Sequence, residues 1–216
     1  MTIHNLDKTN SVLNHFISEI RDVSIQKDAM RFRRNIERIG EILSYELSQE
    51  LGFKDSIVQT PLGEKKIHLV SDQLVLCSVL RAGLPLHQGI LNYFDQIENA
   101  FISAFRQHSS AEEFDIKVEY LATPSLDNKI LILADPMLAT GSSLAAVHEV
   151  LKKMGSIRQV HIVAVIAAEE GIDFVSKHFP ENTHLWVATV DQELNSKGYI
   201  VPGLGDAGDL AYGSKL

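Results

Sequence analysis

Residues 130–155 read ILILADPMLATGSSLAAVHEVLKKMG, and this stretch decides the fold class. The unbroken apolar run at 130–134 predicts a strand that is buried on both faces, as in a parallel sheet. Asp135 ends the strand, a short loop follows, and residues 141–154 carry apolar side chains at helical spacing. A buried strand, a short loop and a helix make up the repeating unit of an α/β fold.

The same alternation continues on both sides of this unit. Apolar runs typical of strands occupy residues 73–80, 99–105, 129–135, 159–168 and 183–189. Helical patterns lie between them, at residues 84–93, 141–154 and 169–178. We therefore predict an α/β fold: a mostly parallel twisted sheet flanked by helices and connected by right-handed crossovers.

The N-terminal part of the chain has a different pattern. Residues 10–22 and 28–51 carry apolar stripes at helical spacing, and Gly52 supplies a stop for the second helix. The basic run RFRRNIER at residues 31–38 is expected on the solvent or subunit-facing side of that helix. Two segments, TPLGEKK at 60–66 and HSSAEEFDIKVEY at 108–120, indicate excursions from the sheet, which we expect to be hairpins.

Composition limits the classes of function. The chain has 216 residues and a formal net charge of −8, which argues against a general nucleic-acid binder. Its single cysteine, Cys77, lies in the apolar run LVLCSVL and is expected to be a buried structural thiol. The sequence lacks the pattern of a signal peptide and an apolar run of the ~20 residues that span a bilayer. We expect a cytoplasmic protein that binds neither nucleic acid nor membrane.

The start of the helix at 141–154 is a candidate phosphate site. Thr140, Gly141, Ser142 and Ser143 offer hydroxyls and successive amides at a helix N-terminus, where anions bind well. Asp135 is expected in the crevice at the carboxyl ends of the strands. The spacing alone fits equally well an ordinary strand, turn and helix with Thr140 as the N-cap. The segment is not a Walker loop, because it lacks G-x-x-x-x-G-K-[ST].

A second glycine-rich segment, GLGDAG at residues 203–208, fits the G-x-G-x-x-G pattern of a dinucleotide-binding turn. That pattern has a function only between a strand and a helix inside a βαβ unit. We do not expect the strand, turn and helix order here, and only eight residues follow Gly208. This excludes an NAD or flavin site. Taken alone, the segment would then indicate a flexible glycine-rich tail.

Five segments in order resemble the uracil phosphoribosyltransferase family of type I phosphoribosyltransferases. They are RFRRNIERIGEILSYE at 31–46, LRAGLPLHQG at 80–89, AFR at 104–106, DPMLATG at 135–141 and GYIVPGLGDAGDLAYG at 198–213. The resemblance implies the transfer of a phosphoribosyl group from 5-phosphoribosyl diphosphate (PRPP) to uracil, with Mg²⁺ as the cofactor.

The resemblance also implies the residues of the site. Catalytic roles fall on Asp135, Arg106 and Asp206. PRPP contacts fall on Arg81, Arg106, Asp135, Pro136, Met137, Leu138, Ala139, Thr140, Gly141, Ser142, Ser143 and Asp206. Uracil contacts fall on Tyr199, Ile200, Gly205, Asp206 and Ala207. We expect no metal-ligating side chains, because Mg²⁺ dehydrates reluctantly and is held mainly by PRPP oxygens and water.

Two positions depart from relatives of this type. Ser142 stands where many relatives have a second glycine, and it adds a side chain close to the phosphate. Pro136 stands where most phosphoribosyltransferases have a second acid, a departure shared by the uracil subfamily, and it leaves Asp135 as the main carboxylate for the ribose hydroxyls.

The expected organisation is one phosphoribosyltransferase domain over residues 1–216. Within it, 1–52 form an N-terminal helical region, 73–190 the α/β core and 191–216 a C-terminal base-binding segment. The family and the long N-terminal helices suggest a homodimer or higher homo-oligomer, and GTP is an effector of some relatives. Two alternatives stay open: a different base specificity, and a non-enzymatic, nucleotide-sensing RNA-binding regulator on the same fold.

Overall fold

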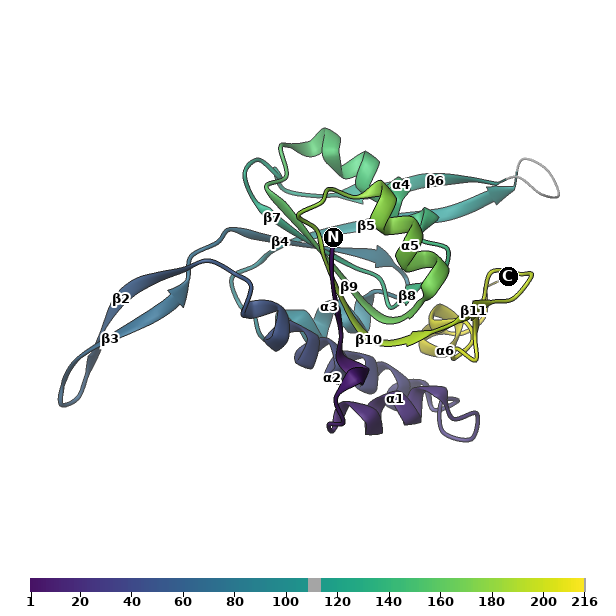
Figure 1. The fold of residues 1–216 in the computed structure, drawn as a ribbon, viewed down its shortest axis with the longest axis horizontal. Coiled ribbons are helices and arrows are strands. Elements are labelled where there is room, and N and C mark those ends of the chain that lie inside the picture. The colour runs from purple at the N-terminus through teal and green to yellow at the C-terminus, as the bar shows by residue number, and fades with distance from the viewer. Residues whose placement is uncertain (109–113, 216) are drawn as a thin grey trace.

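The computed structural model describes residues 1–108 and 114–215, and side chains within residues 104–118 are outside this description. A twisted central sheet is covered by helices on both faces, and one long hairpin projects away from the body (Figure 1). In the described part of the chain, no helix has the length and the apolar character that crossing a membrane requires.

The main sheet confirms the predicted fold class. Its strand order is β1-β10-β9-β7-β4-β5-β6, and the short strand β8 also pairs with β9. These strands are β1 (Thr2–Asn5), β4 (Leu74–Leu80), β5 (Glu98–His108), β6 (Phe114–Ala122), β7 (Ile130–Ala134), β8 (Met137–Leu138), β9 (Gln159–Ala168) and β10 (His184–Asp191). All pairs are parallel except β5 with β6, which is antiparallel.

Alternate residues of the central strands point to opposite faces, as the pleat of a strand requires. Leu76 and Ile132 face the core cluster under α1 (Leu13–Arg21), α2 (Ala29–Ser48), α3 (Leu84–Leu91) and α6 (Ala207–Tyr212). Cys77 and Leu133 face the cluster under α4 (Ser142–Leu151) and α5 (Glu169–His178). Both faces are therefore apolar, which explains the unbroken apolar runs in the sequence.

Cys77 is the buried thiol that the sequence predicts. Its side chain is fully buried in the second of these clusters, and burial raises the pKa of the thiol to about 12. A thiol of this kind stays protonated and packs as a small apolar group.

The two N-terminal helices form where the sequence predicts them, with somewhat shorter bounds. The Asp28 side chain caps α2 by accepting a hydrogen bond from the Arg31 amide at 3.0 Å. The stripe that α2 buries is Phe32, Ile36, Ile39, Leu43 and Leu47. Helix α3 packs tightly on α2 at Gly89, where a Cβ atom would lie 2.1 Å from the Glu37 carbonyl oxygen. This contact fixes the helix that follows the Arg81 turn.

Both predicted hairpins are confirmed. Strands β2 (Phe53–Thr60) and β3 (Gly63–Val70) pair antiparallel with each other and form the long projection in Figure 1. Strands β5 and β6 form the second hairpin, whose residues 109–113 are outside the described part. A small sheet of β11 (Glu193–Leu194) and β12 (Ile200–Val201) leads to the C-terminal segment.

Candidate active site

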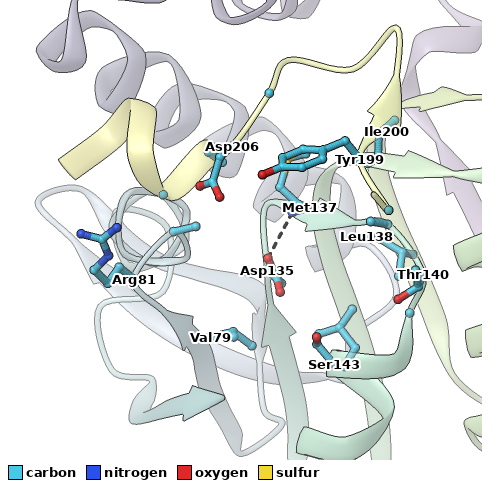
Figure 2. Close-up of a pocket in the computed structure, with 18 of the residues that line it drawn as sticks. Val79, Arg81, Asp135, Met137, Leu138, Thr140, Ser143, Tyr199, Ile200 and Asp206 are labelled. Atoms are coloured by element: carbon cyan, nitrogen blue, oxygen red, sulfur yellow. Dashed lines mark hydrogen bonds between the residues drawn. The ribbon is translucent and has the colours of Figure 1, made fainter. Parts of the chain in front are cut away.

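A cleft of about 540 Å³ opens at the carboxyl ends of β4 and β7. It is lined by residues 79–82, 135, 137–141, 143–144, 197–200, 205–208 and 215. Figure 2 shows Tyr199 and Ile200 of the C-terminal segment beside Met137 and Leu138 of the loop after β7, and Asp206 of the same segment on the side of Arg81. Crevices outside the carboxyl ends of parallel strands are the usual ligand sites of open α/β sheets.

The loop between β7 and α4 forms one wall of the cleft. Gly141 is the N-cap of α4 and has a φ angle of 77°, a left-handed conformation that favours glycine. The first hydrogen bond of the helix runs from the Ala145 amide to the Gly141 carbonyl at 3.0 Å. The amides of residues 142–144 therefore precede the hydrogen-bonded ladder of the helix, as they do at an anion site.

Two hydroxyls of the same loop form a hydrogen bond. Thr140 Oγ1 and Ser142 Oγ are 2.8 Å apart, and the Ser142 amide donates to Thr140 Oγ1 at 3.4 Å. The sequence also fitted an ordinary strand, turn and helix with Thr140 as the N-cap. In the structure Gly141 is the N-cap, and Thr140 stabilises the turn. The extra side chain of Ser142 is accommodated by this hydroxyl pair.

Asp135 lies between the walls of the cleft. It directly follows β7, and its Oδ1 accepts a hydrogen bond from the Met137 amide at 3.1 Å (Figure 2). Burial raises the pKa of the carboxyl from 3.8 to about 6, and the Met137 hydrogen bond opposes this shift. At neutral pH, Asp135 is therefore a carboxylate with few hydrogen bonds of its own, able to accept from a ligand or to stabilise a positive charge.

Arg81 lies on the opposite side of the cleft from Thr140 (Figure 2). Its Nη2 donates to Asp209 Oδ1 at 3.2 Å and to the Gly213 carbonyl at 3.3 Å. Its Nε is buried and has no hydrogen-bond partner among the described residues. A guanidinium whose donors are only partly used is suited to bind an anion that enters the cleft.

The C-terminal segment forms the remaining wall. Ile200 is buried, whereas Tyr199 is half exposed beside it. Gly205 has a φ angle of 95°, and Asp206 caps α6 by accepting from the Asp209 amide at 2.9 Å. Figure 2 shows the Asp206 carboxylate directed into the cleft, above Asp135. The segment therefore presents both backbone and a carboxylate to the cleft.

Residues near the N-terminus hold this segment in place, which sequence reasoning missed. Arg21 forms an ion pair with Asp191 at 2.8 Å, and both side chains hydrogen-bond the backbone of Gly203. Arg33 donates to the Ala211 carbonyl at 2.6 Å and lies over the Tyr212 ring. The expectation that the RFRRNIER run faces only solvent or another subunit was therefore wrong for Arg33.

One local expectation about GLGDAG was also wrong. The short strand β12 precedes it and α6 follows, so the segment does have the order strand, glycine turn, helix. However, β12 pairs antiparallel with β11 outside the main sheet, and α6 has six residues with no strand after it in the described chain. Because β12 is outside the parallel sheet, the segment is not the turn between a parallel strand and its crossover helix, which is the context that a dinucleotide-binding turn requires.

The cleft brings together most of the predicted site residues. Those that line it are Arg81, Asp135, Met137, Leu138, Ala139, Thr140, Gly141, Ser143, Tyr199, Ile200, Gly205, Asp206 and Ala207. Pro136 and Ser142 lie within the same loop but do not line the cleft. The backbone of Arg106 pairs with Ile116 in the β5–β6 hairpin, and its side chain falls outside the described part.

The cleft also contains residues that sequence reasoning missed. Two of them are cations, Lys197 and Lys215, and others extend the Arg81 turn, namely Val79, Leu80 and Ala82. The lysines flank the segment 198–213, so a search for basic residues beside that motif would have found them. They add positive charge to a cleft whose own acids are Asp135 and Asp206.

Comparison with known proteins gives consistent matches over the whole chain. The family model described as uracil phosphoribosyltransferase matches residues 8–214. A protein of Porphyromonas gingivalis named uracil phosphoribosyltransferase is 48% identical over 216 residues, which is all of both chains. One of the same name from Thermococcus gammatolerans is 39% identical over 203 residues, covering 93% of this chain and 88% of the relative.

Solved structures are similar as well. The AQ2163 protein of Aquifex aeolicus has a TM-score of 0.87 and 30% identity, over all of both chains. A hypoxanthine phosphoribosyltransferase of Staphylococcus aureus has a TM-score of 0.53 and 16% identity, over 86% of this chain and 84% of that one. The second likeness concerns the fold alone.

Proposed function

Because this chain belongs to the uracil phosphoribosyltransferase family, it transfers the 5-phosphoribosyl group of PRPP to uracil, giving UMP and diphosphate, and we propose that the cleft described above is where it does so. This reaction salvages a pyrimidine base. The observation that carries the proposal is the position of Asp135, which lies between a helix N-terminus, an arginine and a backbone-rich wall.

The three parts of PRPP have matching partners in the cleft. The amides and hydroxyls of the 140–143 loop suit the 5′-phosphate, because they combine a helix N-terminus with hydroxyl donors. The Asp135 carboxylate suits the ribose hydroxyls. Arg81 suits the diphosphate, since a guanidinium can form two parallel hydrogen bonds to phosphate oxygens. Arg106 keeps the same role as a proposal that rests on the sequence.

We assign uracil to the wall formed by Tyr199, Ile200 and residues 205–207. Uracil presents an N3 donor between two carbonyl acceptors, and backbone carbonyls and amides can match that edge. The positive φ of Gly205 supports this role, because it turns the backbone in a way that a side chain would oppose. The buried Ile200 offers an apolar contact for the flat base.

Catalysis of the transfer depends on electrostatic stabilisation of the transition state rather than on a covalent intermediate with the enzyme. Departure of the diphosphate from the anomeric carbon leaves positive charge on the ribose, and this charge is largest in the transition state. The carboxylates of Asp135 and Asp206 both line the cleft, and they can stabilise this positive charge. Arg81 and Arg106 oppose the negative charge that develops on the leaving group. Fixed groups of this kind also align the two substrates.

We propose Mg²⁺ as the cofactor, held mainly by PRPP oxygens and water. The donor set fits this arrangement, since Asp135 and Asp206 are hard oxygen ligands that can accept hydrogen bonds from a hydrated Mg²⁺. The described residues contain no cluster of three or more His, Cys, Asp or Glu side chains that could hold a metal. When bound, the ion neutralises phosphate charge in a protein that is acidic as a whole.

We further propose that the chain forms a homodimer or a higher homo-oligomer. The β2–β3 hairpin supports this, because it projects from the body and exposes Ile57 and Leu62 (Figure 1). An isolated two-stranded hairpin is at best marginally stable in water. Light scattering gives the mass directly, and a monomer at micromolar concentration would contradict the proposal. Addition of GTP to the activity assay decides whether it is an effector.

Base specificity is tested by incubating the enzyme with PRPP, Mg²⁺ and each nucleobase in turn, and identifying the nucleotide product by mass. The expected product is UMP from uracil, with cytosine at least about 10⁴-fold poorer, since several buried groups would face like against like. Efficient use of another base would show that the C-terminal wall binds that base rather than uracil.

A further inference from the structure

Arg81 is already paired with Asp209, an acid of the C-terminal segment. Its Nη2 lies 3.2 Å from Asp209 Oδ1, and this acid stands in the first turn of α6. The Gly213 carbonyl, just beyond α6, accepts from the same nitrogen at 3.3 Å. The arginine proposed for the diphosphate therefore also contacts the C-terminal segment, through a carboxylate and a backbone carbonyl.

The geometry of this pair makes it exchangeable. Both side chains are partly exposed, at 39% for Arg81 and 35% for Asp209, and the contact joins one guanidinium nitrogen to one carboxylate oxygen. Partly exposed ion pairs of this kind contribute little free energy. A phosphate group can instead form two parallel hydrogen bonds to a guanidinium, which is the stronger arrangement. A diphosphate that enters the cleft can therefore displace the Asp209 carboxylate from Arg81, and this displacement lowers its net affinity.

Helix α6 itself is held by other contacts and does not depend on this pair. Arg33 binds the Ala211 carbonyl at 2.6 Å and stacks on Tyr212, and the buried Ala207 and Ala211 pack in the core. Asp206 keeps the N-cap of the helix. Arg81 can thus leave Asp209 while α6 stays in place.

We infer that Asp209 is the resident counter-ion of Arg81 and sets the affinity of the cleft for diphosphate. This inference rests on the proposed function, because it takes Arg81 as a diphosphate ligand. Asp209 occupies the guanidinium before PRPP binds, is displaced by the diphosphate group, and pairs with Arg81 again when the product leaves. It is a positioning residue that weakens the binding of PRPP and favours the release of diphosphate.

The test measures the binding of inorganic diphosphate, with Mg²⁺, to the full chain by titration calorimetry. Asp209→Asn should bind diphosphate about 2- to 5-fold more tightly than wild type, the scale expected from losing a competing exposed ion pair. The Michaelis constant for PRPP should fall by a similar factor, while that for uracil stays unchanged. A purely structural role for Asp209 would not lower one constant and spare the other.

Two further variants separate the causes. Tyr212→Leu removes the ring beneath Arg33 and loosens α6 but keeps Asp209, so it should leave diphosphate binding unchanged. Arg81→Ala should weaken diphosphate binding at least about 10-fold, and adding Asp209→Asn to it should change nothing more, because the two effects pass through one contact.

Each outcome decides one point. Unchanged or weaker diphosphate binding by Asp209→Asn overturns the inference and leaves the role of Arg81 intact. An equal gain in Tyr212→Leu also overturns it, since looseness of α6 would then be the cause. Unchanged binding by Arg81→Ala would instead remove Arg81 from the diphosphate site and contradict the proposed function.

Discussion

Replacement of Asp135 by asparagine keeps the shape of the side chain and removes its charge. The carboxylate lies between the walls of the cleft, with the Met137 amide 3.1 Å from Oδ1. Loss of a fixed group that stabilises transition-state charge costs about 2 to 4 kcal/mol. At neutral pH, Asp135→Asn should therefore lower kcat/KM by about 30- to 1,000-fold.

The pH dependence follows from the raised pKa. With a pKa of about 6, the carboxyl is almost fully ionised at pH 7.5 and about one-tenth ionised at pH 5. Wild-type kcat/KM should fall about 10-fold over that interval, whereas an acid at its ordinary pKa of 3.8 would cause almost no loss. Asp135→Asn should lack this step. The phosphates of PRPP also titrate, but they do so equally in both proteins, so the ratio of the two profiles isolates Asp135.

Stability should change in the opposite direction to activity. Because the folded-state pKa is raised, the folded protein holds the Asp135 proton more tightly than the unfolded chain, and stability is lost as pH rises from 3.8 through about 6. A shift of about two units corresponds to up to about 3 kcal/mol. Asp135→Asn should thus unfold at higher urea than wild type at pH 7.5.

The assay combines UMP formation between pH 5 and 8 with urea unfolding at pH 7.5. Asp173→Asn is the matched control, because this exposed acid on α5 does not line the cleft, and it should behave like wild type in both measurements. Wild-type activity in Asp135→Asn would refute the catalytic role. If Asp135→Asn were inactive and also less stable than wild type at pH 7.5, the conclusion that the buried, ionised carboxylate lowers stability would be refuted.

The remaining predictions concern four other features. Arg106→Lys should raise the Michaelis constant for PRPP or lower turnover although it keeps the charge, because an ammonium cannot form the two-pronged phosphate contact; unchanged constants would exclude Arg106 from the site. Gly205→Val should weaken uracil binding, since a β-branched residue opposes a φ of 95°. Two controls should keep the preference for uracil over cytosine: Ala207→Ser, and Gly63→Val in the β2–β3 hairpin. Excess EDTA should abolish UMP formation, and undiminished turnover would remove Mg²⁺ from the mechanism. Burial and neighbouring histidines lower the pKa of His161 to about 3, so the folded state should lose stability as pH falls below 6.5. Urea unfolding at pH 7.5 and pH 5 should therefore show a smaller loss of stability for His161→Gln than for wild type. Equal losses would contradict a lowered pKa of His161.

The central sheet could be predicted from the sequence because its strands are buried on both faces. Runs such as 130–134 and 159–168 are short and rich in Val and Ile, which favours buried strands over buried helices, and the helices between them follow from their apolar stripes. The edge strand β1 was missed, since Thr2–Asn5 is short, mostly polar and partly exposed. Strand β6 was expected only as part of a hairpin, because its sequence FDIKVEYLA mixes charged and apolar residues.

The site was predictable in its motifs but not in its supports. The loop after Asp135 and the segment 198–213 carry local patterns that resemble a known family. The ion pair between Arg21 and Asp191, and the bond from Arg33 to Ala211, join residues 170 and 178 positions apart. Single-sequence patterns report neighbours along a helix or strand, so contacts between the two ends of the chain leave no periodic signal.

The most direct test of this account is the crystal structure of the enzyme with bound UMP. The predicted result has the 5′-phosphate on the amides and hydroxyls of residues 140–143, the ribose hydroxyls on Asp135, and the base against Ile200 with its polar edge on the backbone of residues 205–207. UMP bound elsewhere, or bound in the cleft with its phosphate away from the start of α4, would contradict the assignment of this cleft as the active site.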